Sequence, residues 1–510
     1  MNTKKIKVAL LGVGTVGTGV YKLIQRRTDV MVRTIGAEME VSKILVHNLN
    51  KQREGIDASL LTDNWQEIVN DPEIQIVVEV MGGIEPARTM ILEALHAGKH
   101  VVTANKDLLA AHGKELLDAA EEKHCDLLFE AAVAGGIPII RPLKQCLAGN
   151  EIDEVIGIVN GTTNYILTKM FEDGMEFSDA LKKAQELGYA EADPTADVEG
   201  LDAGRKMAIM ASIAFHSRVV FADVYTEGIT KITAADIAYA KEFDSVIKLL
   251  GVARNTPEGI EVGVYPVMIA RDHPLASVRD SFNAVFIHGD AVDDAMFYGR
   301  GAGEMPTASA VVGDVIDEAR NIEYGCSGRI SCTCYQQLAV KDFGDVKNKF
   351  FLRMQVENCP GVLAQIAKVF GEHKVSIARV VQKNAKTDRA ELVIVTEKVK
   401  EKHMGSALCE LKEMKSIFEG REYMKDLSST QFFQVESGPQ IQAKDILEIV
   451  YRALVEKGYN PVNQIVGYIM SGDPTYITSY NGDRSLIMKM ERDELVEEML
   501  KTYIEHNKWV

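Results

Sequence analysis

The chain has 510 residues, of which 46% are hydrophobic and 26% are charged. This length exceeds what one hydrophobic core organises, so we expect three or four domains of ordinary globular composition. The net charge of −17 argues against a nucleic-acid-binding protein, because such proteins present a basic face to the phosphates. No stretch approaches the roughly 20 apolar residues of a membrane span, so none is predicted.

The first residues and the cysteines indicate a cytoplasmic protein. The apolar run from Ile6 to Leu11 resembles the start of a secretory signal, but Gly12 interrupts it and no small-residue cleavage site follows. The seven cysteines are odd in number and scattered, as is typical of reduced thiols. The one cluster, Cys326, Cys332 and Cys334, matches no zinc motif, so we expect no metal there.

The first patterned element is a short apolar run followed by glycines and then by apolar residues at helical spacing. In a dinucleotide-binding turn, Gly12 permits the tight turn, Gly14 lets the backbone approach a pyrophosphate, and Gly17 lets the helix pack on the strand. An ordinary strand–helix turn is the alternative, but the order of strand, turn and helix favours a dinucleotide site. The predicted cofactor loop consists of Gly12, Val13, Gly14, Thr15, Val16 and Gly17.

The second predicted strand, Val41 to Val46, bears on which nicotinamide cofactor is bound. An NAD-selective site usually has a carboxylate near the end of this strand to hold the ribose 2′-hydroxyl. The loop after Val46 instead carries Lys51 and Arg53, whose cations suit a 2′-phosphate. This pattern favours NADP(H), with NAD(H) as the alternative if the two cations are only solvated loop charges.

Further strand-like runs, Ile74 to Val80 and His100 to Thr103, flank a helical stretch from Pro86 to Ala97. Alternating strands and helices after a glycine turn predict an α/β fold with a doubly wound parallel sheet of the Rossmann type. Ligands of such sheets bind beyond the carboxyl ends of the strands. Lys106, which follows Thr103 closely, is therefore expected near the ligand.

The segment from Gly188 to Met210 combines an acidic loop with an apolar helix. Asp202 and Lys206 are four residues apart on that helix and therefore share a face. One interpretation is a simple salt bridge. The other is a substrate pocket, in which carboxylates hold an ammonium group and a lysine donates a proton to an alkoxide, its pKa lowered by burial and by a second cation. The acidic loop carries Glu191, Asp193, Asp197 and Glu199.

Residues 1 to about 325 resemble the homoserine dehydrogenases almost without interruption. The resemblance implies an oxidoreductase that interconverts L-aspartate 4-semialdehyde and L-homoserine with NAD(P)H, in the synthesis of threonine, methionine and isoleucine. The motifs that carry it are Gly12–Gly17, Val101–Lys106, Phe129–Pro138, Val159–Tyr165, Glu191–Lys206 and Gly299–Gly303.

The resemblance also implies roles for individual residues. Lys206 is expected to donate the proton, with Lys106 close to both cofactor and substrate. Glu191 and Asp202 are expected to bind the amino-acid substrate, with Asp197 as an additional candidate. Further cofactor contacts are expected at Thr103, Lys106, Gly188 and Gly303. A sodium ion is implied at Glu130, Val133, Gly135 and Ile137, where carbonyl oxygens and one carboxylate suit a hard cation.

The resemblance divides this region into two domains. The cofactor domain is expected at residues 1–149, with a returning helix within 303–325. A mixed α/β catalytic and dimerisation domain is expected at 150–302, in a homodimer or homotetramer. Residues 326–348 lose apolar periodicity and are predicted to be a linker.

A βαββαβ pattern follows at residues 349–426 and resembles an ACT domain. The predicted elements are strand 350–357, helix 362–373, strands 376–382 and 391–396, helix 400–414 and strand 417–424. Asn358 and Gly361, in the turn that opens the first helix, are expected to hold an amino-acid effector. Many modules of this topology bind no ligand. Attached to this enzyme, the domain is expected to sense L-threonine.

Residues 430–510 resemble the IreB family of small helical phosphoproteins. Helices are predicted at 445–454 and 483–506. In that family an N-terminal threonine is the target of a Ser/Thr kinase, and Thr430 stands at the comparable place. A helical dimerisation appendage without a signalling role is the alternative.

Two hypotheses for the whole chain follow. The first is a dehydrogenase regulated by threonine. The second is an inactive sensor that only binds nucleotide and amino acid. The joint presence of Lys106, Lys206, Glu191 and Asp202 favours the first, because an inactive protein has no use for the complete set.

Overall fold

A computed structural model gives the fold as two compact units, Met1–Gln434 and Val435–Val510, which are described separately. The structure describes residues 5–329, 332–383, 388–418, 430–432 and 443–478, together with 487, 495, 496, 499–501, 503 and 504. Within these residues, no helix combines the length and the apolar run that a membrane crossing requires.

The first unit begins with a six-stranded sheet whose described strand pairs are all parallel. Its order, β3-β2-β1-β4-β5-β6, reverses between β1 and β4, so the predicted doubly wound sheet is confirmed. The strands are β1 Lys5–Leu11, β2 Glu38–Leu45, β3 Leu61–Thr62, β4 Ile74–Glu79, β5 His100–Thr103 and β6 Leu127–Leu128.

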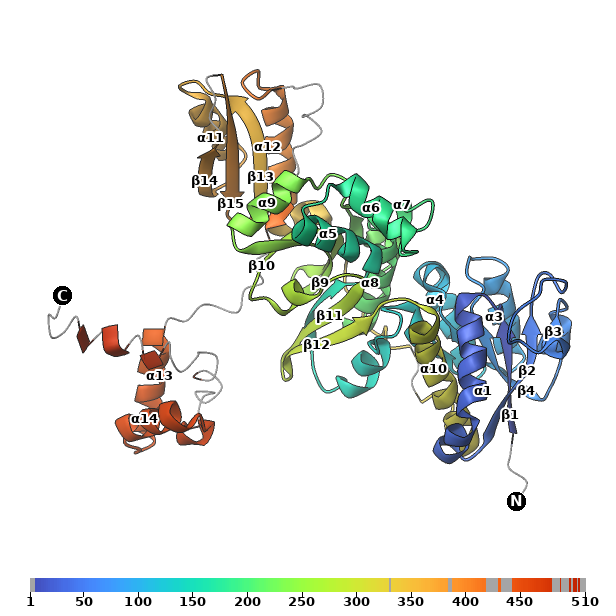
Figure 1. Cartoon of the computed structure of the whole chain (residues 1–510). Helices are drawn as coiled ribbons and strands as arrows, with labels where there is room; N and C mark the ends of the chain where they lie inside the picture. The colour runs from blue at the N-terminus through green and yellow to red at the C-terminus, as the bar shows by residue number, and fades with distance from the viewer. Residues whose placement is uncertain are drawn as a thin grey trace. The chain divides into compact units, whose positions relative to one another are not determined.

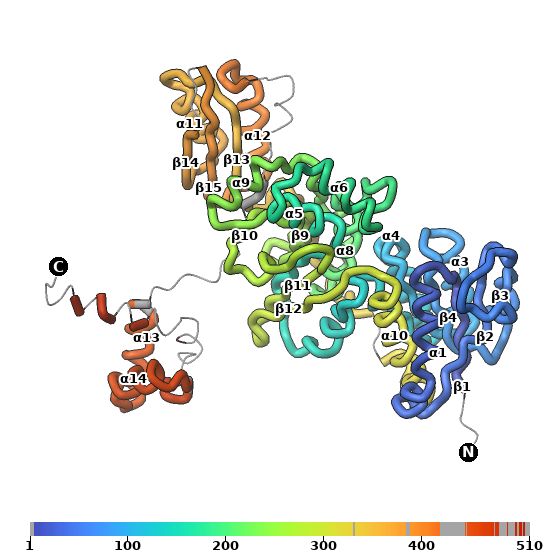
Figure 2. The backbone as a smooth tube through the Cα atoms, viewed as in Figure 1, coloured from blue at the N-terminus to red at the C-terminus, as the bar shows by residue number. Residues whose placement is uncertain are grey.

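Successive side chains of β1 enter two different apolar layers, because neighbouring residues of a strand point to opposite faces. Ile6, Val8 and Leu10 pack with α1 and α10, whereas Ala9 and Leu11 pack with α3 and α4. Although α10 is distant from α1 in sequence, it lies along α1 and completes this domain (Figures 1 and 2). The helices are α1 Thr15–Ile35, α2 Gln66–Val69, α3 Ala87–His96, α4 Lys106–Glu122 and α10 Glu304–Tyr324.

The middle of the first unit is a largely antiparallel sheet covered by helices. β9 and β10 form a long hairpin, β7 and β11 extend it, and β12 is the outer strand. Helix α8 packs on β7, β9 and β10. The strands are β7 Ile152–Ile158, β8 Tyr225–Thr226, β9 Ser245–Thr256, β10 Gly259–Ala270, β11 Phe282–Gly289 and β12 Asp293–Arg300. The helices are α5 Gly161–Asp173, α6 Phe177–Glu186, α7 Thr195–Val198, α8 Leu201–Ala214 and α9 Ala234–Glu242.

The segment predicted to be a linker is bound to this middle domain by two β-bridges and by ring stacking. Gln336 forms a bridge with Ser217, and Val340 forms one with Ile260. The ring of Phe343 stacks on that of Tyr225 with centroids 3.8 Å apart. The connection to the next domain is therefore packed against the protein.

A small domain with the predicted strand and helix order follows. Its elements are β13 Lys347–Glu357, α11 Val362–Glu372, β14 Ile377–Lys383, β15 Arg389–Thr396, β16 Val399–Lys400 and α12 Glu401–Glu413. Of the last predicted strand, Ile417 bridges to Val356, and residues 419–424 lie outside the described part. β17, Thr430–Phe432, lies between β10 and β13, so the middle and small domains share one eleven-stranded sheet.

A buried polar cluster joins the small domain to the middle domain. Arg353 of β13 donates from Nε to Asp236 Oδ1 at 2.9 Å and from Nη2 to Thr233 Oγ1 at 3.2 Å. Asp236 is fully buried and forms a capping box with Thr233 at the start of α9. Tyr239 of α9 also donates to Glu391 of β15. The start of α9 and the sheet of the small domain are thus held together by charge-assisted hydrogen bonds.

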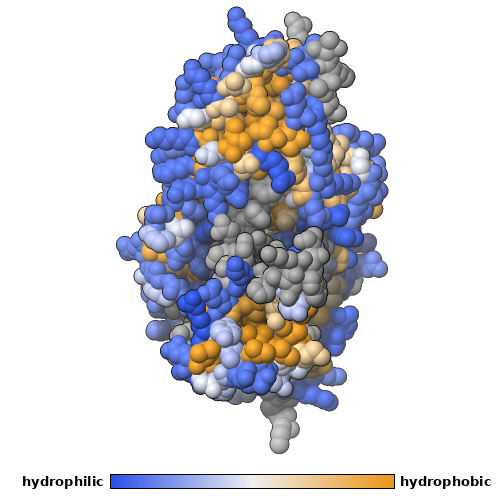
Figure 3. All heavy atoms as spheres, turned by 90° about the vertical axis from the view of Figure 1, so that its left-hand side faces the viewer, coloured by the Kyte–Doolittle hydropathy of each residue, from blue (hydrophilic) through white to orange (hydrophobic). Residues whose placement is uncertain are grey.

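The second unit contains the helices α13 Ala443–Glu456 and α14 Pro461–Ser471, and α13 includes the predicted helix at 445–454. Its core includes Val450, Leu454 and Ile465. Apolar residues are also exposed at the surface, where Figure 3 draws hydrophobic residues in orange. The exposed large apolar residues of α13 and α14 are Ile449, Tyr451, Val455, Val462, Val466 and Met470. The helix predicted at 483–506 falls largely outside the described residues.

Candidate active site

The glycine loop joins β1 to α1 at the point where the sheet order reverses. Gly12 has a φ of +99°, and a Cβ there would lie 3.1 Å from the carbonyl oxygen of Val80. A Cβ on Gly17 would lie 2.3 Å from the carbonyl oxygen of Gly12, so neither position admits a side chain without displacement. Nothing would contact a Cβ on Gly14 within 4 Å, and α1 has neither a side-chain cap nor an acidic residue in its first turn. This uncapped helix start fits a dinucleotide pyrophosphate.

Two lysines and one aspartate meet where α4 and α8 begin. Lys106 is the first residue of α4 and follows β5 after two intervening residues, whereas Asp202 and Lys206 lie one turn apart on α8. Asp202 Oδ1 is 3.3 Å from Lys106 Nζ, and Asp202 Oδ2 is 2.7 Å from Lys206 Nζ. Lys206 Nζ also donates to the carbonyl oxygen of Val159 at 2.7 Å. The predicted helix pair is therefore present, and a residue from the cofactor domain joins it.

Asn160 connects this cluster to a second carboxylate. Its Nδ2 donates to Asp197 Oδ1 at 2.7 Å and to Asp202 Oδ2 at 3.0 Å. Its Oδ1 accepts from the N–H of Thr163 at 2.9 Å and thereby caps α5. The buried amide therefore fixes the separation of Asp197 and Asp202, a role for Asn160 that no sequence pattern indicated.

Burial and neighbouring charges set the protonation of the cluster. Burial alone would raise the pKa of Asp202, but the ammonium groups of Lys206 and Lys106 outweigh it and hold that pKa well below its ordinary value. Burial raises the pKa of Asp197 above its ordinary value, against the hydrogen bond from Asn160. For Lys106, burial lowers the pKa, but Asp202 and Asp107 outweigh it and raise the pKa overall. The ion pair thus favours the charged forms of both Lys106 and Asp202.

The loop that carries Gly188 and Glu191 is exposed and lies at the start of α5. Thr162 Oγ1 donates to the carbonyl oxygen of Tyr189 at 2.6 Å, and the rings of Tyr165 and Tyr189 are 5.0 Å apart. In the described structure, no hydrogen bond or ion pair links the Glu191 carboxylate to the lysine cluster. The structure therefore assembles Lys106, Lys206, Asp202 and Asp197, and leaves Glu191 in the neighbouring loop.

The remaining predicted cofactor residues lie at separate element ends. Thr103 is the last residue of β5, is fully buried, and donates from Oγ1 to Glu79 at 2.6 Å. Gly303 precedes α10 with a φ of +126°. An ion pair that the sequence did not indicate, Arg205 Nε to Asp107 Oδ1 at 2.9 Å, also links α8 to α4.

The residues implied for a sodium ion form a buried turn after β6. The Glu130 carboxylate accepts from three consecutive backbone N–H groups, those of residues 139–141. Among the described backbone hydrogen bonds, none reaches the carbonyl oxygens of Val133, Gly135 or Ile137. Buried carbonyls without donors fit a hard cation, whereas the Glu130 side chain is already occupied.

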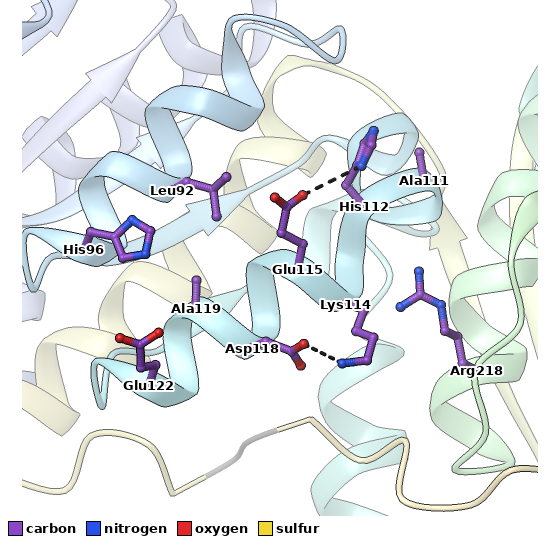
Figure 4. Close-up of a pocket in the computed structure, with 10 residues that line it drawn as sticks. All are labelled: Leu92, His96, Ala111, His112, Lys114, Glu115, Asp118, Ala119, Glu122 and Arg218. Atoms are coloured by element: carbon purple, nitrogen blue, oxygen red, sulfur yellow. Dashed lines mark hydrogen bonds and ion pairs between the residues drawn. The ribbon is translucent and has the colours of Figure 1, made fainter.

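A polar groove of about 630 Å³ lies elsewhere, along α3 and the later part of α4 (Figure 4). Its side chains pair with one another: Lys114 Nζ is 2.5 Å from Asp118, and His112 is 3.8 Å from Glu115. None of the predicted site residues lines it. The groove is therefore separate from the lysine cluster, although both involve α4.

Comparison with known proteins identifies the family. The family model for the homoserine dehydrogenase NAD-binding domain matches residues 12–130, and that for homoserine dehydrogenase matches residues 138–316. The homoserine dehydrogenase of Corynebacterium glutamicum is 49% identical over 396 residues, which cover 77% of this chain and 88% of the relative. That of Bacillus subtilis is 43% identical over 419 residues, covering 82% and 97%. The chain belongs to the homoserine dehydrogenase family.

Solved structures agree with this assignment. A homoserine dehydrogenase from Thiobacillus denitrificans matches with a TM-score of 0.79 at 41% identity, covering 85% of this chain and 99% of that one. A hyperthermophilic archaeal homoserine dehydrogenase mutant in complex with NADPH matches with a TM-score of 0.53 at 28% identity, covering 62% and 97%. As a homoserine dehydrogenase, this chain is an oxidoreductase, and it contains an NAD(P)-binding domain.

The two C-terminal resemblances are confirmed as well. The ACT domain model matches residues 350–415, and the IreB regulatory phosphoprotein model matches residues 428–505. The latter match begins before β17, which pairs within the first unit, and continues through the second unit.

Proposed function

We propose that this homoserine dehydrogenase reduces L-aspartate 4-semialdehyde to L-homoserine, on the route to threonine, methionine and isoleucine. The observation that carries the proposal is the mostly buried cluster in which Asp202 pairs with Lys106 on one oxygen and with Lys206 on the other. When bound, NAD(P)H supplies a hydride to the aldehyde carbon. The residues of the chain hold the substrate and deliver the proton.

Lys206 is the proton donor in this proposal. An ammonium group has three N–H donors, and Lys206 uses one on Val159 and one on Asp202. One donor therefore remains for the aldehyde oxygen, on which negative charge grows as the hydride arrives. The proton passes from Nζ to that oxygen, and the product is a neutral hydroxyl group. In the oxidation of homoserine, the neutral amine takes the proton back.

Carboxylates around the lysines are proposed to bind the ammonium group of the substrate. Asp202 and Asp197 are held apart by Asn160, and Glu191 lies in the adjoining exposed loop. Because burial raises the pKa of Asp197, a cation bound beside it would favour its ionised form. Substrate binding and ionisation of Asp197 would then support each other.

The cofactor is proposed to lie along the glycine loop, Thr103, Lys106, Gly188 and Gly303, with a preference for NADP(H). The loop after β2 supports this preference because it lacks a carboxylate at the strand end and carries Lys51 and Arg53. Arg53 Nη1 donates to the carbonyl oxygens of Asn48 and Lys51, which orders the loop. The ratio of kcat/KM for NADPH to that for NADH tests the preference. If this ratio is the same in the native enzyme and in the double variant Lys51→Ala/Arg53→Ala, the proposal that these cations set the preference is contradicted.

A sodium ion is proposed at the turn after β6, held by carbonyl oxygens of Glu130, Val133, Gly135 and Ile137. The buried carbonyl oxygens of Val133, Gly135 and Ile137, which accept no described backbone hydrogen bond, support this site. Glu130 would act through its backbone, whose oxygen also accepts from the N–H of Val133 at 3.4 Å. Thermal unfolding in sodium chloride and in choline chloride at equal ionic strength tests it, because a bound ion stabilises the native state. Identical midpoints would contradict it.

The ACT domain is proposed to make the enzyme sensitive to L-threonine through Asn358 and Gly361. Gly361 precedes α11 with a φ of +95°, and open space surrounds it. We expect L-threonine to lower turnover in the native enzyme and to have less effect in Asn358→Ala. Lys368→Ala, an exposed substitution on the same helix, is the control. Equal inhibition in all three proteins would contradict this assignment.

Two further proposals concern the oligomeric state of the enzyme and phosphorylation of its C-terminal region. Exposed Met296 and Tyr298 on the outer strand β12 favour association into a homodimer or homotetramer, which light scattering tests. The IreB match, over residues 428–505, supports Thr430 as a substrate of a Ser/Thr kinase. Phosphopeptide mapping after incubation with such a kinase tests this site.

The deciding experiment is the initial rate of NADPH oxidation with L-aspartate 4-semialdehyde, with and without L-threonine. Turnover that threonine suppresses would support both the reaction and the effector. Turnover that is indifferent to threonine would retain the reaction and remove the effector. Folded protein that turns over with neither NADPH nor NADH would instead favour an inactive sensor of nucleotide and amino acid.

A further inference from the structure

Glu79 is a fully buried carboxylate that the proposed reaction does not use. It is the last residue of β4, and none of its surface is exposed. Its Oε1 accepts from the backbone N–H groups of Met81 and Gly82 at 2.8 and 3.0 Å. Its Oε2 accepts from Thr103 Oγ1 at 2.6 Å. Glu79 is the acceptor in all three hydrogen bonds, which is the role of a carboxylate whose two oxygens both face donors.

On one side, Glu79 shapes the loop that contacts the cofactor turn. The bonds to Met81 and Gly82 curl this loop back over the end of β4. A Cβ on Gly12 would lie 3.1 Å from Val80 O and 3.2 Å from Met81 Cα, so the loop and the glycine turn are in close contact. Any change in the course of residues 80–82 would therefore displace the turn or the phosphate group it receives.

On the other side, Glu79 fixes the start of α4. Thr103 Oγ1 donates to Glu79 and accepts from the N–H of Asn105 at 3.0 Å. Asn105 Nδ2 donates at 2.6 Å to the carbonyl oxygen of Gly83, and its Oδ1 caps α4 by accepting from Leu108. The hydrogen bonds thus form a closed ring through Glu79 and the loops after β4 and β5. Lys106 is the residue that follows Asn105.

We propose that Glu79 is a positioning residue that sets the spacing between the dinucleotide turn and Lys106. β4 lies beside β1 at the point where the sheet order reverses, where a dinucleotide binds in such folds. From there, one carboxylate reaches both the loop packed on Gly12 and the loop that begins α4. Because Lys106 also pairs with Asp202, displacing its loop changes how the cofactor faces the substrate cluster.

A carboxylate is required because glutamine reverses one bond. In Glu79→Gln, the amide oxygen still accepts from Met81 and Gly82, but the amide nitrogen faces Thr103 Oγ1 as a donor. Thr103 then accepts both from this amide nitrogen and from the N–H of Asn105, and its own hydrogen loses its acceptor in a buried place. The ring therefore opens at Thr103 while the volume of the side chain is kept.

The test compares Glu79→Gln with Glu73→Gln, which replaces an exposed glutamate just before the same strand. The readouts are the dissociation constant of NADPH without substrate, KM and kcat, and the primary isotope effect with 4-deuterated NADPH. We expect Glu79→Gln to weaken NADPH binding by about tenfold, lower kcat by about tenfold and enlarge the isotope effect, because a misplaced donor slows hydride transfer. Glu73→Gln should resemble the native enzyme.

A merely structural role predicts a different result. A smaller folded fraction lowers the apparent kcat but leaves KM, the NADPH dissociation constant and the isotope effect unchanged, and that outcome overturns the proposal. Asn105→Ala breaks the same ring at its bond to the carbonyl oxygen of Gly83 and serves if Glu79→Gln does not fold. This variant should also weaken NADPH binding and enlarge the isotope effect. If its NADPH affinity and isotope effect equal those of Glu73→Gln, the proposal is overturned as well.

The turnover readouts rest on the proposed reaction, whereas NADPH affinity does not. If the native enzyme fails to reduce L-aspartate 4-semialdehyde, the proposed reaction fails, and the NADPH dissociation constants alone decide the role of Glu79. If the native enzyme is active and Glu79→Gln matches it in affinity and isotope effect, only the role of Glu79 fails.

Discussion

The lysine cluster and the turn that opens α11 are both expected to meet amino acids, but they are built differently. At the cluster, Asp202 is mostly buried and is bound by two ammonium groups and the amide of Asn160. At the turn, residues 358–361 are all exposed, and nothing would contact a Cβ on Gly361 within 4 Å. The charges of the cluster are thus fixed before a substrate arrives. The turn at the start of α11 remains open to solvent.

This difference predicts that changes at the cluster act on turnover itself, whereas changes in the small domain act on regulation and on stability. One buried link between the small domain and the middle domain is Arg353 of β13 with Asp236 of α9. Because α9 packs on α5, whose cap is Asn160, this link is one path from the small domain to the catalytic region. Four substitutions test this contrast.

The largest effect is expected for Lys206→Met, which keeps the length of the side chain and removes the proton donor. Turnover should fall by about 10³-fold, within the range for loss of a general acid, while NADPH affinity changes little. Steady-state kinetics and NADPH titration measure the two effects. Lys182→Met, at an exposed lysine of α6, is the control. A loss below tenfold would remove Lys206 from the chemical step.

Asp202→Asn should lower turnover by about 10²-fold and the free energy of unfolding by about 3 kcal/mol at neutral pH, because both lysines lose their carboxylate. The folded-state pKa of Asp202 is lowered, so its stabilising contribution is present above the ordinary carboxyl pKa and is lost as pH falls towards the lowered value. Urea unfolding at pH 7 and at pH 3 should therefore show a smaller difference from the native enzyme at pH 3. Equal differences would contradict the ion pairing.

Arg353→Met should reduce the free energy of unfolding by about 3 kcal/mol, because it leaves Asp236 buried without its guanidinium partner. Turnover without effector should change less than threefold, whereas the response to L-threonine should weaken. Urea unfolding and inhibition curves measure these effects. The control is Arg279→Met, which removes an exposed arginine from its ion pair with Glu172. Full inhibition by threonine in Arg353→Met would show that the effector signal takes another path.

The smallest effect is expected for Glu401→Gln on α12, and it concerns pH. Burial raises the pKa of Glu401 to about 7, against the hydrogen bond from Asn348. The native state therefore binds the proton more tightly than the unfolded chain, and this contribution to stability is lost as pH rises from about 4.5 to 7. Relative to the native enzyme, Glu401→Gln should gain stability between pH 5 and pH 8. Urea unfolding at both pH values tests this, with exposed Glu413→Gln expected to show no such trend.

Sequence patterns predicted the order of domains and most of their elements, because alternation along β1 and the glycine spacing reflect local geometry. β17 was not predicted, because three residues are too few to show a strand pattern. Its strand conformation depends on pairing with β10 and β13. The linker at 326–348 was predicted from its loss of apolar periodicity, but its bridges to Ser217 and Ile260 depend on tertiary contacts.

The site shows the same limit. Asp202 and Lys206 could be paired from their spacing on one helix, and the family resemblance brought in Lys106. Asn160 was part of a recognised motif, but its bonds to Asp197 and Asp202 join residues that are distant in sequence. Glu79 ends an apolar strand and carries no motif, so only its three buried hydrogen bonds reveal it.

The packing of α10 on α1 has a consequence for synthesis of the chain on the ribosome. Ala308, Val311 and Val315 of α10 share the core of β1 and α1, and a Cβ on Gly19 would lie 2.7 Å from the backbone of Glu304. The N-terminal domain therefore emerges with one apolar face uncovered and stays incomplete while the whole catalytic domain is translated. A stop codon after residue 149 would produce a fragment that is prone to aggregation, because its apolar face stays uncovered. Adding α10 as a separate peptide should restore the solubility of this fragment.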